Sequence, residues 1–96
     1  MDNDKDKFLL SNIQKNNKKA FDALFRKYYP SLCQLAFLIV KSEEIAEEVV
    51  QEIFINIWEQ RNRLKIKKSL RSYLFTATRN KALNYLSSEK KRLVYE

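Results

Sequence analysis

The chain has 96 residues, a formal net charge of +7 and hydrophobic residues at 45% of its positions. This length accommodates one domain with one core, and the apolar content excludes wholesale disorder. The chain has no histidine and a single cysteine, Cys33, which excludes an internal disulfide and removes the commonest general base and metal ligand. The absence of glycine and the single proline disfavour tight turns and favour helices joined by polar links.

Two helices are predicted before residue 41. The first runs from about residue 4 to residue 14, and its apolar side consists of Phe8, Leu9 and Ile13. The second runs from about residue 18 to residue 40, where apolar residues recur at steps of three and four, a strong helical pattern. Pro30 falls inside this second helix and is expected to bend or split it, because proline removes an amide donor.

A third helix is predicted from Ser42, a suitable N-cap, to about Gln60. Its apolar residues spread over more than half the circumference, which indicates contact with more than one neighbouring helix. The remaining face carries Glu44, Glu48, Gln51, Glu52, Asn56 and Glu59. Ile55 projects from the middle of that face. It is either an isolated surface apolar residue, which is normal, or an apolar anchor inside a charged rim, as at many protein interfaces.

Residues 61–68 form a basic link, which is interpreted as an ordered loop because no partner strand is in view. Ser69 is predicted to cap a fourth helix that runs to about Lys91. One mostly polar ridge of this helix consists of Tyr73, Thr76, Asn80 and Asn84. The fold class is therefore predicted to be all-α, a compact bundle of about four helices.

The chain changes electrical sign after its third helix. Glutamates dominate residues 43–59, whereas lysines and arginines dominate residues 61–92. An acidic helix beside a basic one suits two unlike partners, a basic protein surface and a polyanion such as nucleic acid. On charge alone, a merely soluble basic domain fits equally well. A basic fourth helix lying on an anionic membrane surface fits less well, because its apolar residues are divided between two stripes.

The sequence contains no catalytic constellation, so the chain is predicted to bind and not to catalyse. It has no glycine-rich phosphate loop, no Cys/His metal set and no Ser–His–Asp combination. Glu44, Glu48 and Glu52 share a helix face, but no histidine joins them, and neither a metal nor a cofactor is expected. No apolar run has signal-peptide or membrane-spanning length, which predicts a cytoplasmic protein with no membrane insertion.

Three segments carry recognisable motifs: AFDALFRKYYPSL at residues 20–32, AEEVVQEIFINIW at residues 46–58 and SLRSYLFTATRNKALNYL at residues 69–86. They resemble, in this order, three motifs of bacterial RNA polymerase sigma factors of the extracytoplasmic-function (ECF) group. Those motifs are A-F-x-x-L-Y-x-x-Y-x-P-x-L, A-E-D-L-V-Q-E-V-F-x-x-x-W, and an aromatic-Leu pair followed by A-x-R-N-x-A-x-D-x-L. The chain departs from the family at Tyr73, where Trp is frequent, and at Thr76, where Arg is common.

The resemblance implies a sigma region 2 domain, which directs RNA polymerase to promoters and helps to melt them. It implies that the third helix docks on the clamp helices of the polymerase β′ subunit through Glu48, Gln51, Glu52 and Ile55. It also implies that the basic loop and the fourth helix recognise the promoter −10 element and hold a base flipped out of the non-template strand. The DNA-binding residues would be Arg61, Arg63, Lys65, Lys67, Lys68, Arg71, Tyr73, Thr76, Arg79 and Asn80. An anti-sigma factor is a further expected partner.

Residues 1–92 are predicted to form the region 2 domain and residues 93–96 the start of a linker. ECF sigma factors carry a second, C-terminal helix-turn-helix domain that reads the −35 element, and nothing after Leu86 can supply it. The chain is therefore expected to represent half of a sigma factor. The alternative is a helical protein-interaction module, such as an adaptor or an anti-sigma-like partner, without DNA recognition.

Overall fold

The structure, a computed structural model, describes the backbone of residues 2–95 and the side chains of residues 3–89. It contains helices α1 (Asp2–Gln14), α2 (Lys18–Val40), α3 (Glu43–Glu59) and α4 (Leu70–Tyr95). No strand occurs in this described part of the chain. The predicted all-α bundle is confirmed, and the link between α3 and α4 is a loop, as predicted.

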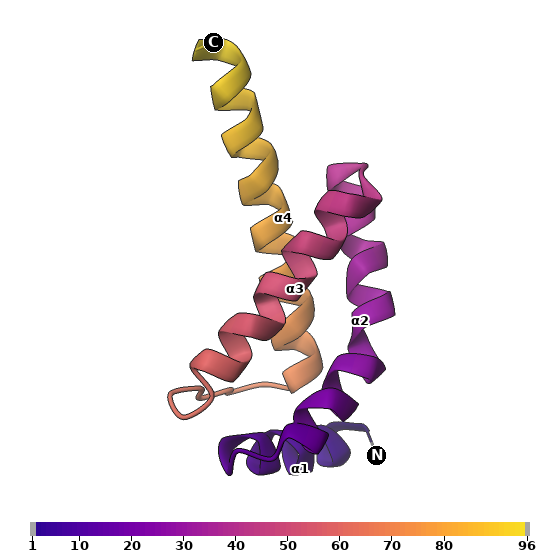
Figure 1. The fold of residues 1–96 in the computed structure, drawn as a ribbon, viewed down its shortest axis with the longest axis vertical. Coiled ribbons are helices and arrows are strands. Elements are labelled where there is room, and N and C mark those ends of the chain that lie inside the picture. Colours follow the sequence, from indigo (N-terminus) through magenta and orange to yellow (C-terminus); the bar gives the residue numbers. More distant parts are fainter. Residues whose placement is uncertain (1, 96) are drawn as a thin grey trace.

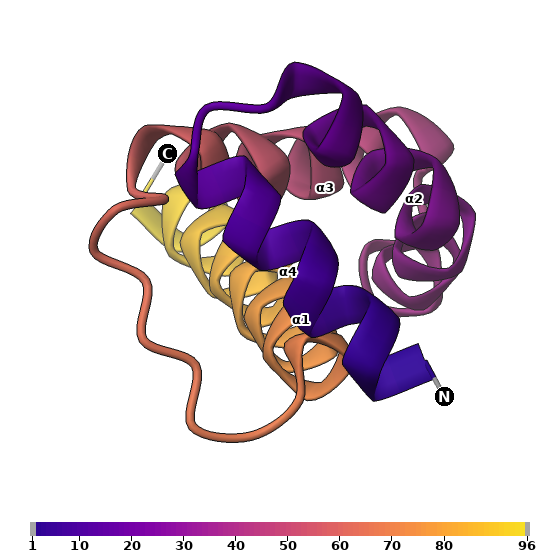
Figure 2. The same cartoon turned by 90° about the horizontal axis from the view of Figure 1, so that it is seen from below.

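α2 and α4 form the centre of the bundle, because each of them contacts the other three helices. α2 and α3 lie side by side, both contact α4, and α1 crosses one end of the bundle against α2 and α4 (Figure 1). Seen from below, α1 lies across the start of α4, and the α3–α4 loop swings out beside them (Figure 2). The C-terminal part of α4 extends beyond the other helices (Figure 1). The loop is thus left on one flank of the molecule, close to the end of α1.

One core joins residues from all four helices. Its largest fully buried apolar side chains are Ile13, Leu24, Leu32, Val50, Phe54, Ile57 and Leu74. The ring of Phe54 meets the rings of Phe21 and Phe25 from α2, with centroids 6.2 and 4.9 Å apart. α3 contacts both α2 and α4, so the wide apolar arc predicted for this helix is confirmed.

Side-chain caps begin three of the helices. Asn17 accepts a hydrogen bond from the Ala20 amide at 3.1 Å, and the Ser42 hydroxyl accepts one from Ile45 at 3.3 Å. The Ser69 hydroxyl accepts one from Ser72 at 3.0 Å, which confirms the predicted start of α4. These caps satisfy amides that have no partner within the helix.

The prediction that Phe8 belongs to a packed apolar side of α1 is wrong, because Phe8 is 70% exposed. Asp6 is buried instead, because its carboxylate accepts hydrogen bonds from two residues of α2, the Lys27 ammonium at 2.6 Å and the Tyr28 hydroxyl. Phe8 lies two residues from Asp6, about 200° around the helix, and therefore faces solvent. A buried polar contact has set the rotation of α1.

Pro30 does not split α2: the helix is continuous from Lys18 to Val40, and Tyr28 and Leu32, on either side of the proline, are buried in the same core. The alternative expectation, a bend at Pro30, stays a prediction. α4 continues to Tyr95, past its predicted end at Lys91. The predicted division between domain and linker after residue 92 therefore falls inside a helix, and it stays a prediction.

Candidate nucleic-acid and protein interfaces

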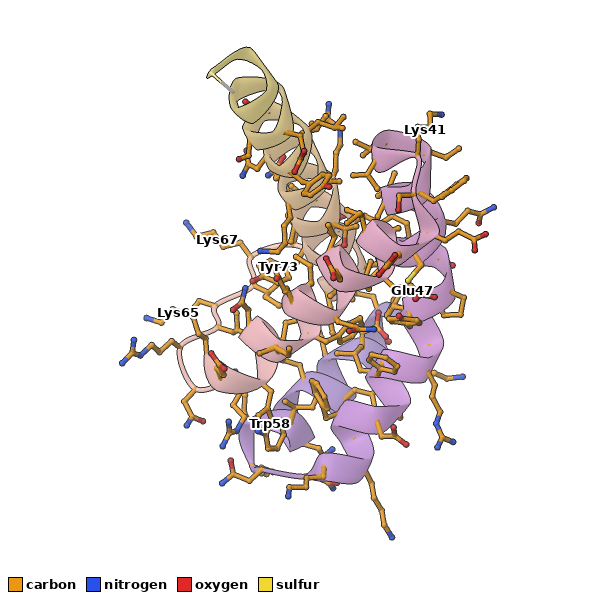
Figure 3. All side chains as sticks on the ribbon, turned by 45° about the horizontal axis from the view of Figure 1, so that its top comes forward. Lys41, Glu47, Trp58, Lys65, Lys67 and Tyr73 are labelled. Atoms are coloured by element: carbon orange, nitrogen blue, oxygen red, sulfur yellow. The ribbon has the colours of Figure 1, made fainter. Side chains whose placement is uncertain are left out.

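A surface cavity of about 480 Å³ opens where the α3–α4 loop (residues 60–69) meets the first turns of α4. We call it the loop cavity. It is lined by Lys65, Ile66, Lys67, Lys68, Ser69, Ser72, Tyr73, Thr76, Ala77 and Asn80. Lys65 and Lys67 extend from the loop away from the bundle (Figure 3). The volume lies within the range of about 300–1,000 Å³ that is usual for small-ligand sites.

The lining of the loop cavity combines three kinds of chemistry. Tyr73, a residue that is 37% exposed, offers an aromatic ring, and Asn80 offers an amide with both a donor and an acceptor. The loop contributes lysine ammonium groups, which attract phosphate. A flat heterocycle could stack and hydrogen-bond inside such a cavity while its phosphates remain near the lysines.

The structure brings together most of the predicted DNA-binding residues. Lys65, Lys67, Lys68, Tyr73, Thr76 and Asn80 line the loop cavity. Arg63 and Arg79 are exposed and lie outside its lining. Arg71 is exposed at the start of α4, where its guanidinium lies over the Phe75 ring at 4.7 Å. The role of each residue in DNA binding stays a prediction.

Arg61, another predicted DNA contact, is half-buried and bound within the protein. Its guanidinium lies over the Trp58 ring at 4.1 Å, and its Nε donates to Asn16 Oδ1 at 2.7 Å. It also donates to the Trp58 carbonyl. These contacts assign Arg61 a structural role at the start of the loop, whatever it contributes to DNA binding.

Sequence reasoning missed Gln14, which contacts the same loop. Its Nε2 donates to the carbonyl oxygens of Arg61 at 3.1 Å and Leu64 at 3.4 Å. No sequence pattern signals this role, because a polar residue at the end of a helix is usually solvated. The contact becomes visible only when the end of α1 is placed beside the loop.

The predicted polymerase-binding residues all lie on one exposed face of α3. Glu48, Gln51 and Glu52 are exposed, and Ile55 is 53% exposed between them. We call these four residues the acidic face. The predicted exposure of Ile55 is confirmed, and both interpretations of it remain compatible with its position.

Two members of the acidic face already have partners inside the domain. Gln51 Nε2 donates to the Tyr29 hydroxyl at 3.3 Å, and Glu52 forms an ion pair with Lys81 of α4 at 2.8 Å. The Glu52 side chain is 60% exposed, so this ion pair contributes little to stability. A docking protein could replace either contact at small cost.

A polar cluster in which Asp6 and Tyr28 are buried connects α1 to α2. It consists of Asp6, Lys27 and Tyr28. Burial and the hydrogen bond to Asp6 raise the pKa of Tyr28 to about 12. Neutral Tyr28 is therefore the form that the folded domain favours.

Within residues 3–89, no cluster of three or more side chains is arranged to hold a metal ion. None of the described helices is long and apolar enough to cross a bilayer.

The family described as Sigma-70 region 2 matches residues 24–92 of the sequence. The chain belongs to this family. Its relatives include the RNA polymerase sigma-H factor of Pseudomonas aeruginosa, 27% identical over 89 residues, and the ECF RNA polymerase sigma-E factor of Escherichia coli strain K12, 29% identical over 87 residues. These alignments cover 93% and 91% of the chain but 46% and 45% of the relatives. The region 2 domain therefore spans about half the length of the curated relatives it matches.

A solved structure resembles most of the domain. It is the NMR structure of an engineered region 2 of sigmaE in complex with GTAAAA, with a TM-score of 0.79 and 31% sequence identity. The similarity covers 92% of each chain. Together with the names of the relatives, it confirms that the chain is a region 2 domain of the ECF type.

Proposed function

We propose that this region 2 domain acts in transcription initiation by connecting the RNA polymerase core to the −10 element of promoters. The observation that carries the proposal is the loop cavity, which gathers lysines, an aromatic ring and an amide at the place where the family motif predicts DNA contacts. The domain binds and does not catalyse. It acts in the cytoplasm, and an anti-sigma factor regulates it.

The loop cavity is suited to a base flipped out of the non-template strand. Flipping a base costs a few kcal/mol, which the cavity must recover by stacking and by hydrogen bonds to the base edge. Tyr73 supplies the stacking surface and Asn80 the edge contact, while Lys65 and Lys67 hold the flanking phosphates. The similar domain of sigmaE was solved in complex with GTAAAA, which supports a short single strand as the ligand.

The acidic face is suited to the basic clamp helices of the β′ subunit. Its carboxylates would steer a basic partner toward α3, and desolvation of Ile55 would slow its release. Because the acidic face lies on α3 and the loop cavity on the α3–α4 loop and α4, both partners can be bound at once.

Fluorescence anisotropy with labelled DNA tests the DNA-binding part of this proposal. The domain should bind a single-stranded GTAAAA probe, or a hexamer that it selects from a randomised pool, more tightly than a scrambled strand or the duplex. Affinity for all strands should fall steeply with salt, because lysine contacts release counterions from the phosphates. Equal affinity for every DNA would leave only nonspecific charge attraction and would favour the helical protein-interaction module.

A further inference from the structure

The start of the α3–α4 loop is held by the end of α1. Gln14, the last residue of α1, donates to the carbonyl oxygens of Arg61 and Leu64, which lie 47 and 50 positions away in sequence. Both hydrogen bonds are partly buried, so water competes less well for the carbonyl oxygens. One side chain thus holds two peptide groups of the loop against a different helix.

The second of these peptide groups leads directly into the loop cavity. The Leu64 carbonyl belongs to the peptide group that joins Leu64 to Lys65, and Lys65 lines the cavity. Because a peptide group is planar, holding its carbonyl also holds the direction in which the chain continues. Leu64 and Ile66 are half-buried against the core on either side of Lys65. Gln14 and this apolar packing therefore set the position of the cavity wall together.

The part of the loop that lines the cavity, residues 65–68, is not held by backbone hydrogen bonds of its own. We call it the cavity wall. Among the described residues, positions 64–68 form no backbone–backbone hydrogen bond outside helices. The nearest such bonds are from Arg63 to Gln60 on one side and from Tyr73 to Ser69 on the other. A segment without its own hydrogen bonds opens at low free energy unless side chains from elsewhere hold it.

A second contact reinforces the first from the adjoining turn. Asn16 follows α1 and has a φ of 67°, and its side-chain oxygen accepts the hydrogen bond from Arg61. Arg61 in turn lies over Trp58 at the end of α3. The end of α1 is thereby linked to the end of α3, through Arg61 and Trp58, and to Leu64 further along the loop.

We infer that Gln14 is a positioning residue of the loop cavity, holding its wall ready for an unstacked base and so contributing to discrimination between DNA sequences without touching DNA. Gln14 is absent from the cavity lining, so it acts through Leu64 and Lys65. A wall that is already ordered loses less conformational entropy when the base binds. The effect on DNA rests on the proposed function, whereas the effect on the loop does not.

The first test measures the loop in the absence of DNA. Gln14→Met keeps the length of the side chain but removes both donors, and Gln34→Met on the exposed surface of α2 is the matched control. Backbone order parameters for residues 62–66 should fall from about 0.85 to below about 0.6 in Gln14→Met and stay unchanged in Gln34→Met. Gln14→Glu, which keeps the shape but has no donor, should behave as Gln14→Met does. Unchanged order parameters in both Gln14 variants would overturn the inference.

The second test measures discrimination by the same variants. The ratio of affinities for the preferred hexamer and its scrambled form should fall about fivefold in Gln14→Met, the equivalent of one hydrogen bond, and stay unchanged in Gln34→Met. Affinity for the scrambled strand should not change. A loosened loop with an unchanged ratio would overturn the role in discrimination. If the unmodified domain prefers no sequence, the proposed function fails, and the order parameters still decide whether Gln14 holds the wall.

Discussion

The acidic face and the loop cavity differ in what holds their residues together. The acidic face lies on α3 alone, where residues three and four positions apart are neighbours by helix geometry. The loop cavity combines the α3–α4 loop with α4, and the end of α1 holds the loop. The proposed protein-binding surface is therefore a local property of one helix, whereas the proposed DNA-binding surface depends on contacts between distant segments.

This difference predicts how each surface responds to change. Loosening α1 should disturb the loop cavity and spare the acidic face, because no hydrogen bond described here joins α1 to α3 residues of that face. Changing a side chain of the acidic face should alter polymerase binding and leave DNA discrimination intact.

Replacing the centre of the acidic face should have the largest effect. Ile55→Lys with Gln51→Lys should weaken binding to a β′ clamp-helix fragment by about 100-fold or more, because an apolar anchor is lost and two like charges meet a basic partner. Pull-down followed by a binding titration measures the loss, and circular dichroism checks that the domain stays folded.

The chain offers a matched control for this variant. Gln34 and Leu38 have the same spacing on an exposed surface of α2, where Leu38 is 60% exposed. Gln34→Lys with Leu38→Lys adds the same two charges and should leave polymerase binding within about twofold of the original, since rim and remote charges contribute little. Equal loss in both double variants would show that net charge alone controls the interaction.

Alkaline pH should loosen the contact between α1 and α2. The pKa of Tyr28 is about 12 in the folded domain and about 10 in the unfolded chain, so neutral Tyr28 stabilises the fold below pH 10. That contribution is lost as pH rises from 10 through 12. Between those values the free energy of unfolding should fall by about 1–2 kcal/mol more in the original domain than in Tyr28→Phe, after allowance for solvent screening. Urea denaturation at each pH measures the difference, and parallel curves would contradict it.

Substituting two asparagines of α4, one inside the loop cavity and one outside it, should have smaller and unequal effects on DNA preference. Asn80 lines the loop cavity, whereas Asn84 lies on the same ridge outside it. Asn80→Ala should lower the preference for the selected hexamer about fivefold, since one base-edge hydrogen bond is lost, and Asn84→Ala should not. Anisotropy titrations of both variants provide the comparison; a similar loss in both would place the DNA contact along the ridge and not in the cavity.

The smallest effect concerns the ion pair that joins the acidic face to α4, Glu52 with Lys81. Lys81→Met should change the free energy of unfolding by about 0.5 kcal/mol or less, because the pair is solvent-exposed. Polymerase binding should stay constant or rise slightly, since Glu52 becomes available to the partner. A marked loss of polymerase binding in Lys81→Met would show that the acidic face depends on α4 and is not a local property of α3.

The parts predicted well from the sequence are those governed by local rules. The capping role of Ser42, the exposure of Ile55 and the loop after α3 follow from helix periodicity and capping chemistry. Six of the ten residues that line the loop cavity were predicted as DNA contacts, through the resemblance to the family, because composition cannot place Tyr73 beside Lys65. What was missed involves residues far apart in the chain. Phe8 is exposed because Asp6 is buried by partners on α2.

The sequence by itself determined the helical class, the acidic face of α3 and membership of the region 2 family, because periodicity, charge and motif are properties of neighbouring residues. Only the tertiary structure decided that Arg61 binds Trp58 and Asn16 and that Gln14 holds the cavity wall. A side-chain hydrogen bond across 50 positions depends on where two helices end in space, and that position is set by the packing of the whole core.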